Sequence, residues 1–201
     1  MAKASTAPGT LAPTRDIFVT TASGRSWRLL DPSPADVDFR DIAAHLARLC
    51  RFVGAGHTFY SVAQHSVVVA AQLPPNMRLY GLLHDAHEAY LGDISSPLKE
   101  ALAVLNGREV LAGIVEMHDA AIHAAAGLPW PPPKEVAEAV HAADRRAFCT
   151  EWRDIMPRDV PCPLPFIPMG TRIRALPWPK AEEAFVSELR LHLPPSLRSV
   201  A

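Results

Sequence analysis

Apolar residues recur along most of this chain at spacings of three and four, and short stretches rich in proline and glycine interrupt the pattern. This period is typical of amphipathic helices, whose apolar stripe packs against a core. It predicts helices over residues 34–50, 59–73, 76–91, 109–126, 134–155 and 180–193. Ser96 and Pro97 mark one further helix start. Because residues 59–73 are apolar nearly all round, we expect that helix to be buried and the fold to be all-α.

The N-terminal part of the chain departs from this pattern. Residues 16–20 and 25–30 are strand-like segments on either side of residues 21–24, and together they predict a short β-hairpin. Residues 1–13 are rich in Ala, Ser, Thr, Pro and Gly and lack the layout of a signal peptide, so we expect a disordered tail. Residues 14–201 then form a single domain with a substantial core.

Composition excludes several classes of function. The formal net charge is -1, so no strong electrostatic field favours a polymeric nucleic acid or an anionic membrane as a partner. No apolar run is long enough to span a bilayer. The three cysteines are an odd, scattered set that forms neither a disulfide framework nor a zinc-binding CxxC pattern. We therefore expect a cytoplasmic protein in a reducing compartment.

A polar corner interrupts the helix predicted over residues 76–91. His84 and Asp85 are adjacent there, and Glu88 follows His84 by four residues, so His84 and Glu88 would share one helix face. Two leucines precede the doublet, which suggests that the corner is embedded in a core, where charges need partners or a metal ion. Taken alone, however, the doublet fits the solvated face of a helix better.

Two further polar residues occupy helices that are predicted to pack into the core. His65 lies inside residues 59–73, and Asp144 lies on the flank of the apolar stripe of residues 134–155. Each has an ordinary explanation on its own. His65 could be a core histidine satisfied by one hydrogen bond, and Asp144 could pair with a neighbouring arginine or lysine.

Considered together, these residues indicate one metal site. Two imidazoles and two carboxylates suit Mn, Co, Fe, Ni or Zn, with Mg as a further candidate, better than they suit calcium, which prefers oxygen ligands alone. Four such side chains at unconnected core positions are hard to explain separately. One divalent ion at the centre of a helical bundle explains them jointly. The set is His65, His84, Asp85 and Asp144.

The order of these motifs resembles the HD-domain metal-dependent phosphohydrolases. The closer resemblance is to the compact branch that includes bacterial 5'-deoxynucleotidases of the YfbR type and phage dATP triphosphohydrolases (DatZ-like). The matching segments are residues 51–54, 60–66, 82–90, 92–99 and 143–144. The resemblance implies an HD-domain helical bundle around one metal site, preceded here by the short hairpin.

The resemblance also implies roles for the motif residues. The metal ligands would be His65, His84, Asp85 and Asp144. Glu88 would orient and deprotonate the attacking water, and Asp93 would lie beside the leaving oxygen and the sugar.

Five further residues are expected to bind substrate on the same basis. Arg51 and Lys99 would hold phosphate oxygens and neutralise charge in the transition state. His57, Tyr60 and Pro97 would line the nucleoside pocket. The expected partner is therefore a small-molecule nucleotide.

The expected activity is phosphohydrolysis of a (deoxy)nucleotide. We favour a 5'-deoxynucleotidase that releases nucleoside and phosphate, because only Arg51 and Lys99 among the nearby basic residues sit at matching positions. A dNTP (dATP) triphosphohydrolase that releases triphosphate is the alternative. A catalytically silent nucleotide-binding HD domain and an HD enzyme for another phosphate ester also stay open, as does a homo-oligomer. An HD oxygenase would need a second iron and additional histidines.

Overall fold

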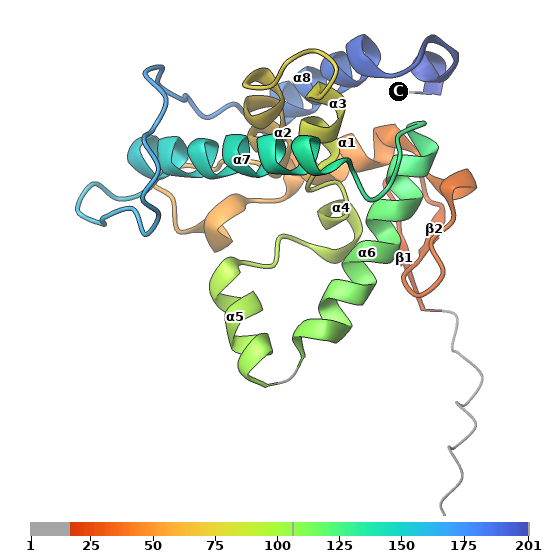
Figure 1. The fold of residues 1–201 in the computed structure, drawn as a ribbon, viewed down its shortest axis with the longest axis horizontal. Helices are drawn as coiled ribbons and strands as arrows, with labels where there is room; N and C mark the ends of the chain where they lie inside the picture. Colours follow the sequence, from red (N-terminus) through yellow and green to blue (C-terminus); the bar gives the residue numbers. More distant parts are fainter. Residues whose placement is uncertain (1–16, 106, 201) are drawn as a thin grey trace, which may run out of the picture.

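The structure is a computed structural model that describes residues 17–105 and 107–200. It is mostly helical, with one small antiparallel hairpin near the N-terminus, which confirms the predicted all-α class and the predicted hairpin (Figure 1). Within the described residues, no helix combines the length and the apolar character needed to cross a bilayer. The elements, in chain order, are β1 (Phe18–Thr20), β2 (Ser26–Arg28), η1 (Pro34–Asp36), α1 (Phe39–Arg48), η2 (Arg51–Gly54), α2 (Val62–Ala71), α3 (Arg78–Leu83), α4 (Glu88–Leu91), α5 (Ser96–Val104), α6 (Arg108–Ala125), α7 (Lys134–Ile155), α8 (Trp178–His192) and η3 (Pro195–Val200).

The hairpin is attached to the helices through an aromatic stack. Strands β1 and β2 pair antiparallel, with Val19 opposite Trp27. Trp27 is fully buried, and its ring stacks on Tyr90 of α4 with centroids 4.1 Å apart. The tail predicted over residues 1–13 lies outside the described residues.

Helix α2 is the centre of the bundle. It contacts α1, α3, α7 and α8, as expected for a helix that is apolar nearly all round. Ser61 caps its N-terminus by accepting a hydrogen bond from the Gln64 backbone N–H. The surrounding core is filled by large apolar side chains from α1, α3 and α8: Ile42, Leu46, Leu82, Leu83, Phe185 and Leu189.

The prediction of one continuous helix over residues 76–91 is wrong. The chain forms α3, then tight turns over residues 84–87, and then the short helix α4. In the turns, the Ala86 N–H donates to the Leu83 carbonyl and the Glu88 N–H donates to the Asp85 carbonyl, each over three residues instead of four. The His84–Asp85 doublet therefore lies at a helix break.

Helices α5 and α6 form a hairpin that projects from the bundle (Figure 1). None of the residues of α5 is buried, and the first half of α6 is largely exposed. Helix α7 has the bounds that the sequence predicts, and α6 and α8 differ from their predictions by one or two residues at each end. Helix α1 begins at Phe39, because Pro34–Asp36 forms a separate 3-10 turn.

Candidate metal centre

Three side chains from three helices meet in the interior of the bundle. His65 comes from α2, His84 follows the last residue of α3, and Asp144 lies in the middle of α7. One ligand atom from each lies within 4.8 Å of the others. The two histidine Nε2 atoms are 3.3 Å apart, and Asp144 Oδ1 is 3.1 Å from His65 Nε2. These three residues form a group that could hold a metal ion, as the sequence predicts.

Asp85 places a second carboxylate at the same point. Its Oδ2 lies 3.1 Å from His84 Nε2 and 3.5 Å from His65 Nε2. Burial alone would raise the pKa of Asp85, but the charges of His84, His65 and Arg51 outweigh burial and hold this pKa well below its usual range. Asp85 therefore lies as an anion beside the two histidines, next to the group of His65, His84 and Asp144.

The hydrogen bonds of the two imidazoles leave both Nε2 atoms free to coordinate. His84 Nδ1 lies 2.8 Å from the Gly81 carbonyl, which can only accept, so Nδ1 carries the proton. His65 Nδ1 lies 2.7 Å from the carboxylate of Glu151 and donates to it. Two Nε2 lone pairs cannot bond to each other, and each nitrogen also lies 3.1 Å from a carboxylate oxygen, so this point favours a proton on an imidazole or a metal ion. The donor set fits a divalent ion.

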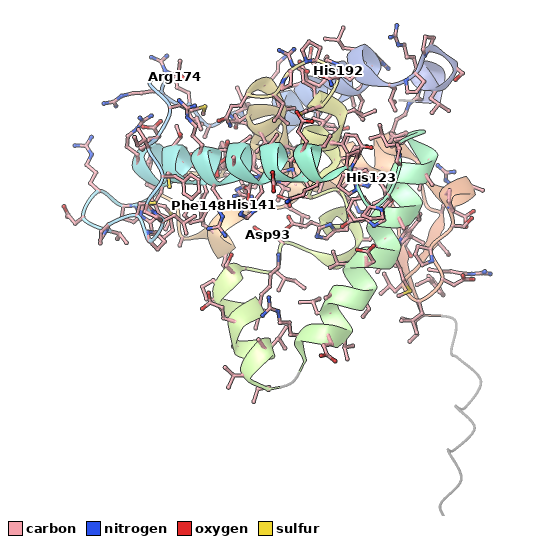
Figure 2. All side chains as sticks on the ribbon, viewed as in Figure 1. Asp93, His123, His141, Phe148, Arg174 and His192 are labelled. Atoms are coloured by element: carbon pink, nitrogen blue, oxygen red, sulfur yellow. The ribbon has the colours of Figure 1, made fainter. Side chains whose placement is uncertain are left out.

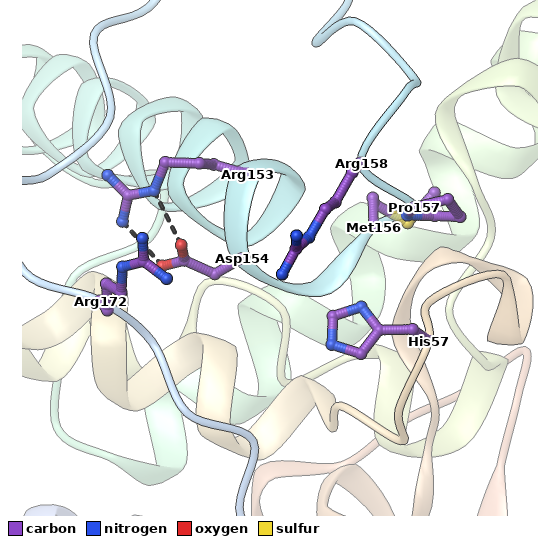
Figure 3. A pocket seen from close by; sticks show the side chains of 7 residues that line it. All are labelled: His57, Arg153, Asp154, Met156, Pro157, Arg158 and Arg172. Carbon is purple, nitrogen blue, oxygen red and sulfur yellow. Dashed lines mark hydrogen bonds and ion pairs between the residues drawn. The ribbon is translucent and has the colours of Figure 1, made fainter.

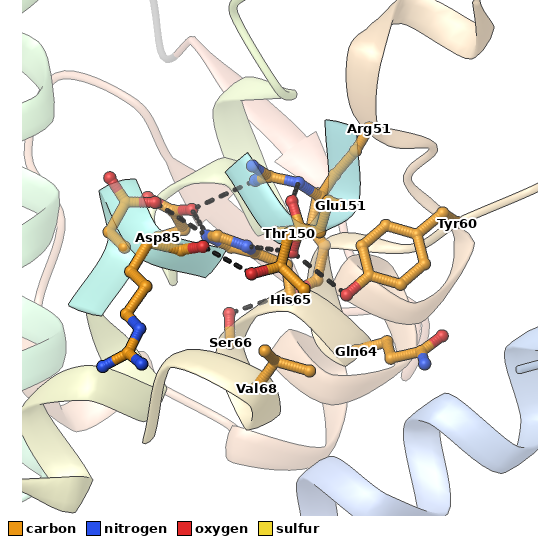
Figure 4. Close-up of polar contacts among 12 residues, drawn as sticks. Arg51, Tyr60, Gln64, His65, Ser66, Val68, Asp85, Thr150 and Glu151 are labelled. Atoms are coloured by element: carbon orange, nitrogen blue, oxygen red, sulfur yellow. Dashed lines mark hydrogen bonds and ion pairs between the residues drawn. The ribbon is translucent and has the colours of Figure 1, made fainter. Parts of the chain in front are cut away.

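Glu151 is the residue of the site that the sequence analysis missed. Its buried carboxylate accepts hydrogen bonds from His65 Nδ1, from the Tyr60 hydroxyl at 3.0 Å and from Arg51 Nε at 3.2 Å (Figure 4). Burial opposes ionisation of Glu151, but Arg51 and His65 outweigh burial and lower its pKa. A carboxylate in this position fixes the orientation of a ligand histidine. Its spacing of seven residues from Asp144, two helical turns along one face, was the available signal.

Arg51 is held in place by an unusual loop. Phe52 and Val53, which follow it, have φ values of 57° and 53°, a region that costs a non-glycine residue about 1–2 kcal/mol. The Phe52 ring packs edge-on against Phe148 of α7, and the Arg51 N–H donates to the Tyr60 carbonyl. These contacts keep the buried Arg51 guanidinium beside Glu151 and 3.7 Å from Asp85.

Two more carboxylates lie close to the ligands. Glu88 is buried, and its Oε2 makes no hydrogen bond within the described residues. Burial, reinforced by the negative charges of Asp85 and Asp93, raises the pKa of Glu88 to about 9. Burial also raises the pKa of Asp93, although Arg51 and Lys99 oppose the shift. In Figure 2, Asp93 lies between α7 and the α5–α6 hairpin. Glu88 and Asp93 therefore lie near enough to Asp85 for its charge to raise both pKa values.

The residues expected to bind substrate are only partly brought together. Lys99 is exposed on α5, but its charge acts on Glu88 and Asp93; Pro97 is exposed on the first turn of the same helix. Tyr60 is buried and donates to Glu151, so it supports the site through Glu151 and does not line an open pocket.

His57 is not brought to the metal ligands. Its backbone N–H donates to the Ile155 carbonyl at the C-terminal end of α7. Its ring lines a different cavity, to which none of the four candidate ligands contributes (Figure 3). His57 therefore lines a cavity other than the one beside His84 and Asp144, and its predicted place in a nucleoside pocket stays a prediction.

A cavity of about 190 Å³ opens directly onto two of the candidate ligands, His84 and Asp144. Its remaining walls are aromatic or aliphatic over most of their area, and the residues are Tyr80, His123, Trp130, Pro132, Val136, Ala137, Val140 and His141. The His123 and Trp130 rings lie 4.3 Å apart. Sequence reasoning did not find this cavity, because its walls combine residues 80–84 with residues 123–144, which are distant in the chain.

Comparison with known proteins identifies relatives but no activity. The chain is 36% identical to an uncharacterized protein of Rhodobacter capsulatus over 184 residues, which cover 82% of this chain and 90% of that protein. It is also 36% identical to the uncharacterized protein YfdR of Escherichia coli (strain K12) over 138 residues, which cover 69% of this chain and 72% of YfdR. No family model matches the chain.

Proposed function

This chain belongs to the same family as YfdR and the Rhodobacter capsulatus protein, and we propose that it is a metal-dependent phosphohydrolase of the HD-domain type that acts on nucleotides. One observation carries the proposal. The two histidine Nε2 atoms and the Asp144 carboxylate form a group that could hold a metal ion, and the Asp85 carboxylate lies 3.1 Å from one of these nitrogens. The buried Glu88, which has an oxygen without a hydrogen-bond partner in the described residues, lies within reach of the charge of Asp85.

His65, His84, Asp85 and Asp144 would hold one divalent ion. When bound, such an ion makes a nearby water more acidic and neutralises phosphate charge. Glu151 keeps the His65 ring oriented, and Arg51 keeps Glu151 and Asp85 ionised by its proximity to both. The ion's identity is one of Mn, Co, Fe, Ni, Zn or Mg.

Glu88 acts as the general base in this proposal. Its pKa is high because it is buried close to the negative charges of Asp85 and Asp93. Neutralising the charge of Asp85 would remove that contribution to the raised pKa of Glu88 and so favour the carboxylate form, which takes a proton from water. The oxygen without a partner is available for that hydrogen bond.

Asp93, Arg51 and Lys99 complete the proposed reaction. Water attacks the phosphorus, the bond between phosphorus and the ester oxygen breaks, and Asp93 donates a proton to the leaving oxygen. The raised pKa of Asp93, caused mainly by burial, suits a proton donor. Arg51 and Lys99, whose charges both act on Glu88 and Asp93, would bind the phosphate oxygens.

The cavity beside His84 and Asp144 supports a nucleotide as the substrate. Its aromatic and aliphatic walls suit a planar base, which gains from ring stacking and from leaving water. Among the described residues, the arginine and lysine charges that act on both Glu88 and Asp93 are those of Arg51 and Lys99. So few basic side chains favour a deoxynucleoside 5'-monophosphate over a triphosphate, which carries more charge.

A product analysis tests this proposal. Purified protein is incubated with deoxynucleoside monophosphates and with dATP in Mn, Co, Mg or Zn, and the products are separated by HPLC. We expect nucleoside and phosphate from at least one monophosphate, and about 10²–10⁴-fold less from the Glu88→Gln variant. Triphosphate from dATP without phosphate from any monophosphate would establish the triphosphohydrolase alternative. If the protein retains the metal but forms no product from any nucleotide, the alternative of a catalytically silent nucleotide-binding domain would stand instead.

A further inference from the structure

A second cavity lies at the C-terminal end of α7 and is larger than the one at the candidate metal centre. Its volume is about 670 Å³, and its walls are His57, Arg153, Asp154, Met156, Pro157, Arg158 and Arg172 (Figure 3). Arg153 follows Asp144 by nine residues on the same helix, which corresponds to about 14 Å along the helix axis. The cavity is therefore a feature separate from the metal ligands.

The walls of this cavity concentrate positive charge. Three arginines and one aspartate give a net charge of +2, on a chain whose net charge is -1. Arg153 is already bound, because it pairs with Asp154 at 2.7 Å and donates to the carbonyls of Met169 and Thr171. In the part of the chain that the structure describes, neither Arg158 nor Arg172 makes a hydrogen bond or a close ion pair, although the charge of Arg172 lowers the pKa of Asp154. The cavity therefore keeps more positive charge than its single aspartate balances.

The geometry of the walls is fixed by the backbone. The His57 N–H donates to the Ile155 carbonyl at 3.0 Å, and a Cβ added at Gly56 would lie 2.9 Å from Ile155 Cγ2. The loop is therefore packed closely on the end of α7. Figure 3 shows the Arg158 side chain extending toward the His57 ring, with Arg172 beside Asp154.

We propose that this cavity binds a phosphate-bearing small molecule at a site distinct from the metal centre. Arginine donates several N–H groups in a planar fork that matches phosphate oxygens. An anion in this concave wall would lie among three arginines that are balanced by a single aspartate. The volume exceeds that of a single phosphate ion, and Met156 and Pro157 offer apolar contacts to the rest of a ligand. The proposal does not depend on the reaction catalysed at the metal centre.

Calorimetric titration with inorganic pyrophosphate tests the site in the full-length chain, in a buffer free of divalent ions. Arg172→Ala removes one proposed contact. Arg174→Ala is the matched control, because Arg174 lies two residues further along the same segment, is exposed and does not line the cavity (Figure 2). We expect Arg172→Ala and Arg158→Ala to weaken binding by about tenfold or more, and Arg174→Ala to leave it unchanged within about twofold.

Other outcomes of the titration overturn the proposal. Equal weakening by Arg172→Ala and Arg174→Ala would show unspecific charge attraction. Loss of binding in Arg51→Ala but not in Arg172→Ala would place the anion at the metal centre, and no binding by the wild type would exclude the site. AMP in a parallel titration separates the two sources of phosphate. If AMP binds more tightly than pyrophosphate and its binding also depends on Arg172, the cavity is a nucleotide site. If AMP binds more weakly than pyrophosphate with the same dependence, the cavity is a site for the free anion. Circular dichroism confirms that each variant is folded.

Discussion

His65 is the residue on which the polar contacts of the candidate site converge. Its Nδ1 donates to Glu151, and its Nε2 lies within 3.5 Å of His84, Asp85 and Asp144. Burial and the charge of Arg51 would lower the pKa of His65, but Glu151 and Asp144 outweigh them and raise it to about 10. A metal-free chain thus holds a proton where we propose the metal ion.

Glu151→Gln tests the support for His65. The amide keeps the shape of the side chain but loses the charge that holds the His65 Nδ1 proton, so we expect metal affinity to fall by about 10–100-fold. Competition with a chromophoric chelator measures the affinity. Glu138→Gln is the control, since Glu138 is exposed on the same helix α7, and it should leave the affinity unchanged. Unchanged affinity in Glu151→Gln would show that Glu151 is not coupled to the ligand.

Glu88 gives the metal-free protein a pH dependence of stability with a definite sign. The folded pKa of about 9 lies above the ordinary value of 4.5, so the folded state holds the proton more tightly than the unfolded state. The resulting stability is fully present below about pH 4.5 and is lost as the pH rises through about 9. His65 adds a loss in the same direction between its ordinary value of 6.5 and about 10.

Glu88→Gln should remove the contribution of Glu88. We expect the melting temperature of the chelator-treated wild type to fall more between about pH 5 and pH 9 than that of Glu88→Gln. Thermal unfolding followed by circular dichroism at both pH values measures the difference. Parallel slopes for the two proteins would mean that Glu88 is ionised in the folded state over this whole range.

At the scale of elements, the site depends on how closely α3 approaches α2. Gly81 lies on α3 three residues before His84, and a Cβ added there would lie 3.2 Å from the Ala70 Cα atom and still closer to the Leu73 side chain. Only glycine allows this approach. The contact sets the distance between the helices that carry His65 and His84.

Gly81→Ala and Gly113→Ala form a matched pair of helical substitutions. A Cβ at Gly113 of α6 meets no atom within 4 Å, so alanine there should stabilise the protein by about 0.5–1 kcal/mol through the lower entropy of the unfolded chain. Gly81→Ala should instead destabilise the protein by about 1–3 kcal/mol and weaken metal binding, because it overpacks the contact between α2 and α3. Urea unfolding of both variants decides this; a gain in stability at both positions would contradict the close approach.

The sequence predicted most of the elements, because their apolar periods are long. Helix α7, a run of 22 residues, has the predicted bounds. The break between α3 and α4 was missed because each side continues the apolar period, and only the three-residue hydrogen bonds at Ala86 and Glu88 reveal it. The candidate ligands were found because each is a polar residue in an apolar stretch. Glu151 and the two cavities depend on contacts between distant segments, which a single sequence does not display.

At the scale of the whole molecule, the candidate centre connects three helices of the bundle. Its ligands come from α2, from the turn after α3 and from α7, so the site forms only when these helices pack together. An ion that binds only the folded state therefore stabilises the fold. The region that projects from the bundle, α5 and α6, contributes none of the four ligands.

Added divalent metal should raise the melting temperature of chelator-treated protein. At a free concentration about 100 times the Kd, the gain is about 2.7 kcal/mol, which corresponds to about 5–10 °C for a chain of this size. Because the ion must displace the His65 proton, whose pKa is about 10, the gain should shrink as the pH falls from about 8 to about 6. Differential scanning fluorimetry at both pH values checks the size and the sign; a gain that grows toward low pH would contradict displacement of this proton.

The central claim is that His65, His84, Asp85 and Asp144 form one metal centre, and elemental analysis of purified protein tests it most directly. The wild type and Glu88→Gln should each contain about one divalent ion per chain, whereas Asp85→Ala and Asp144→Asn should contain less than about a tenth of that. Metal retained by the Glu88→Gln variant would show that Glu88, the proposed base, is not a metal ligand. A wild type without metal after supplementation, or an unchanged content in Asp85→Ala and Asp144→Asn, would contradict the account.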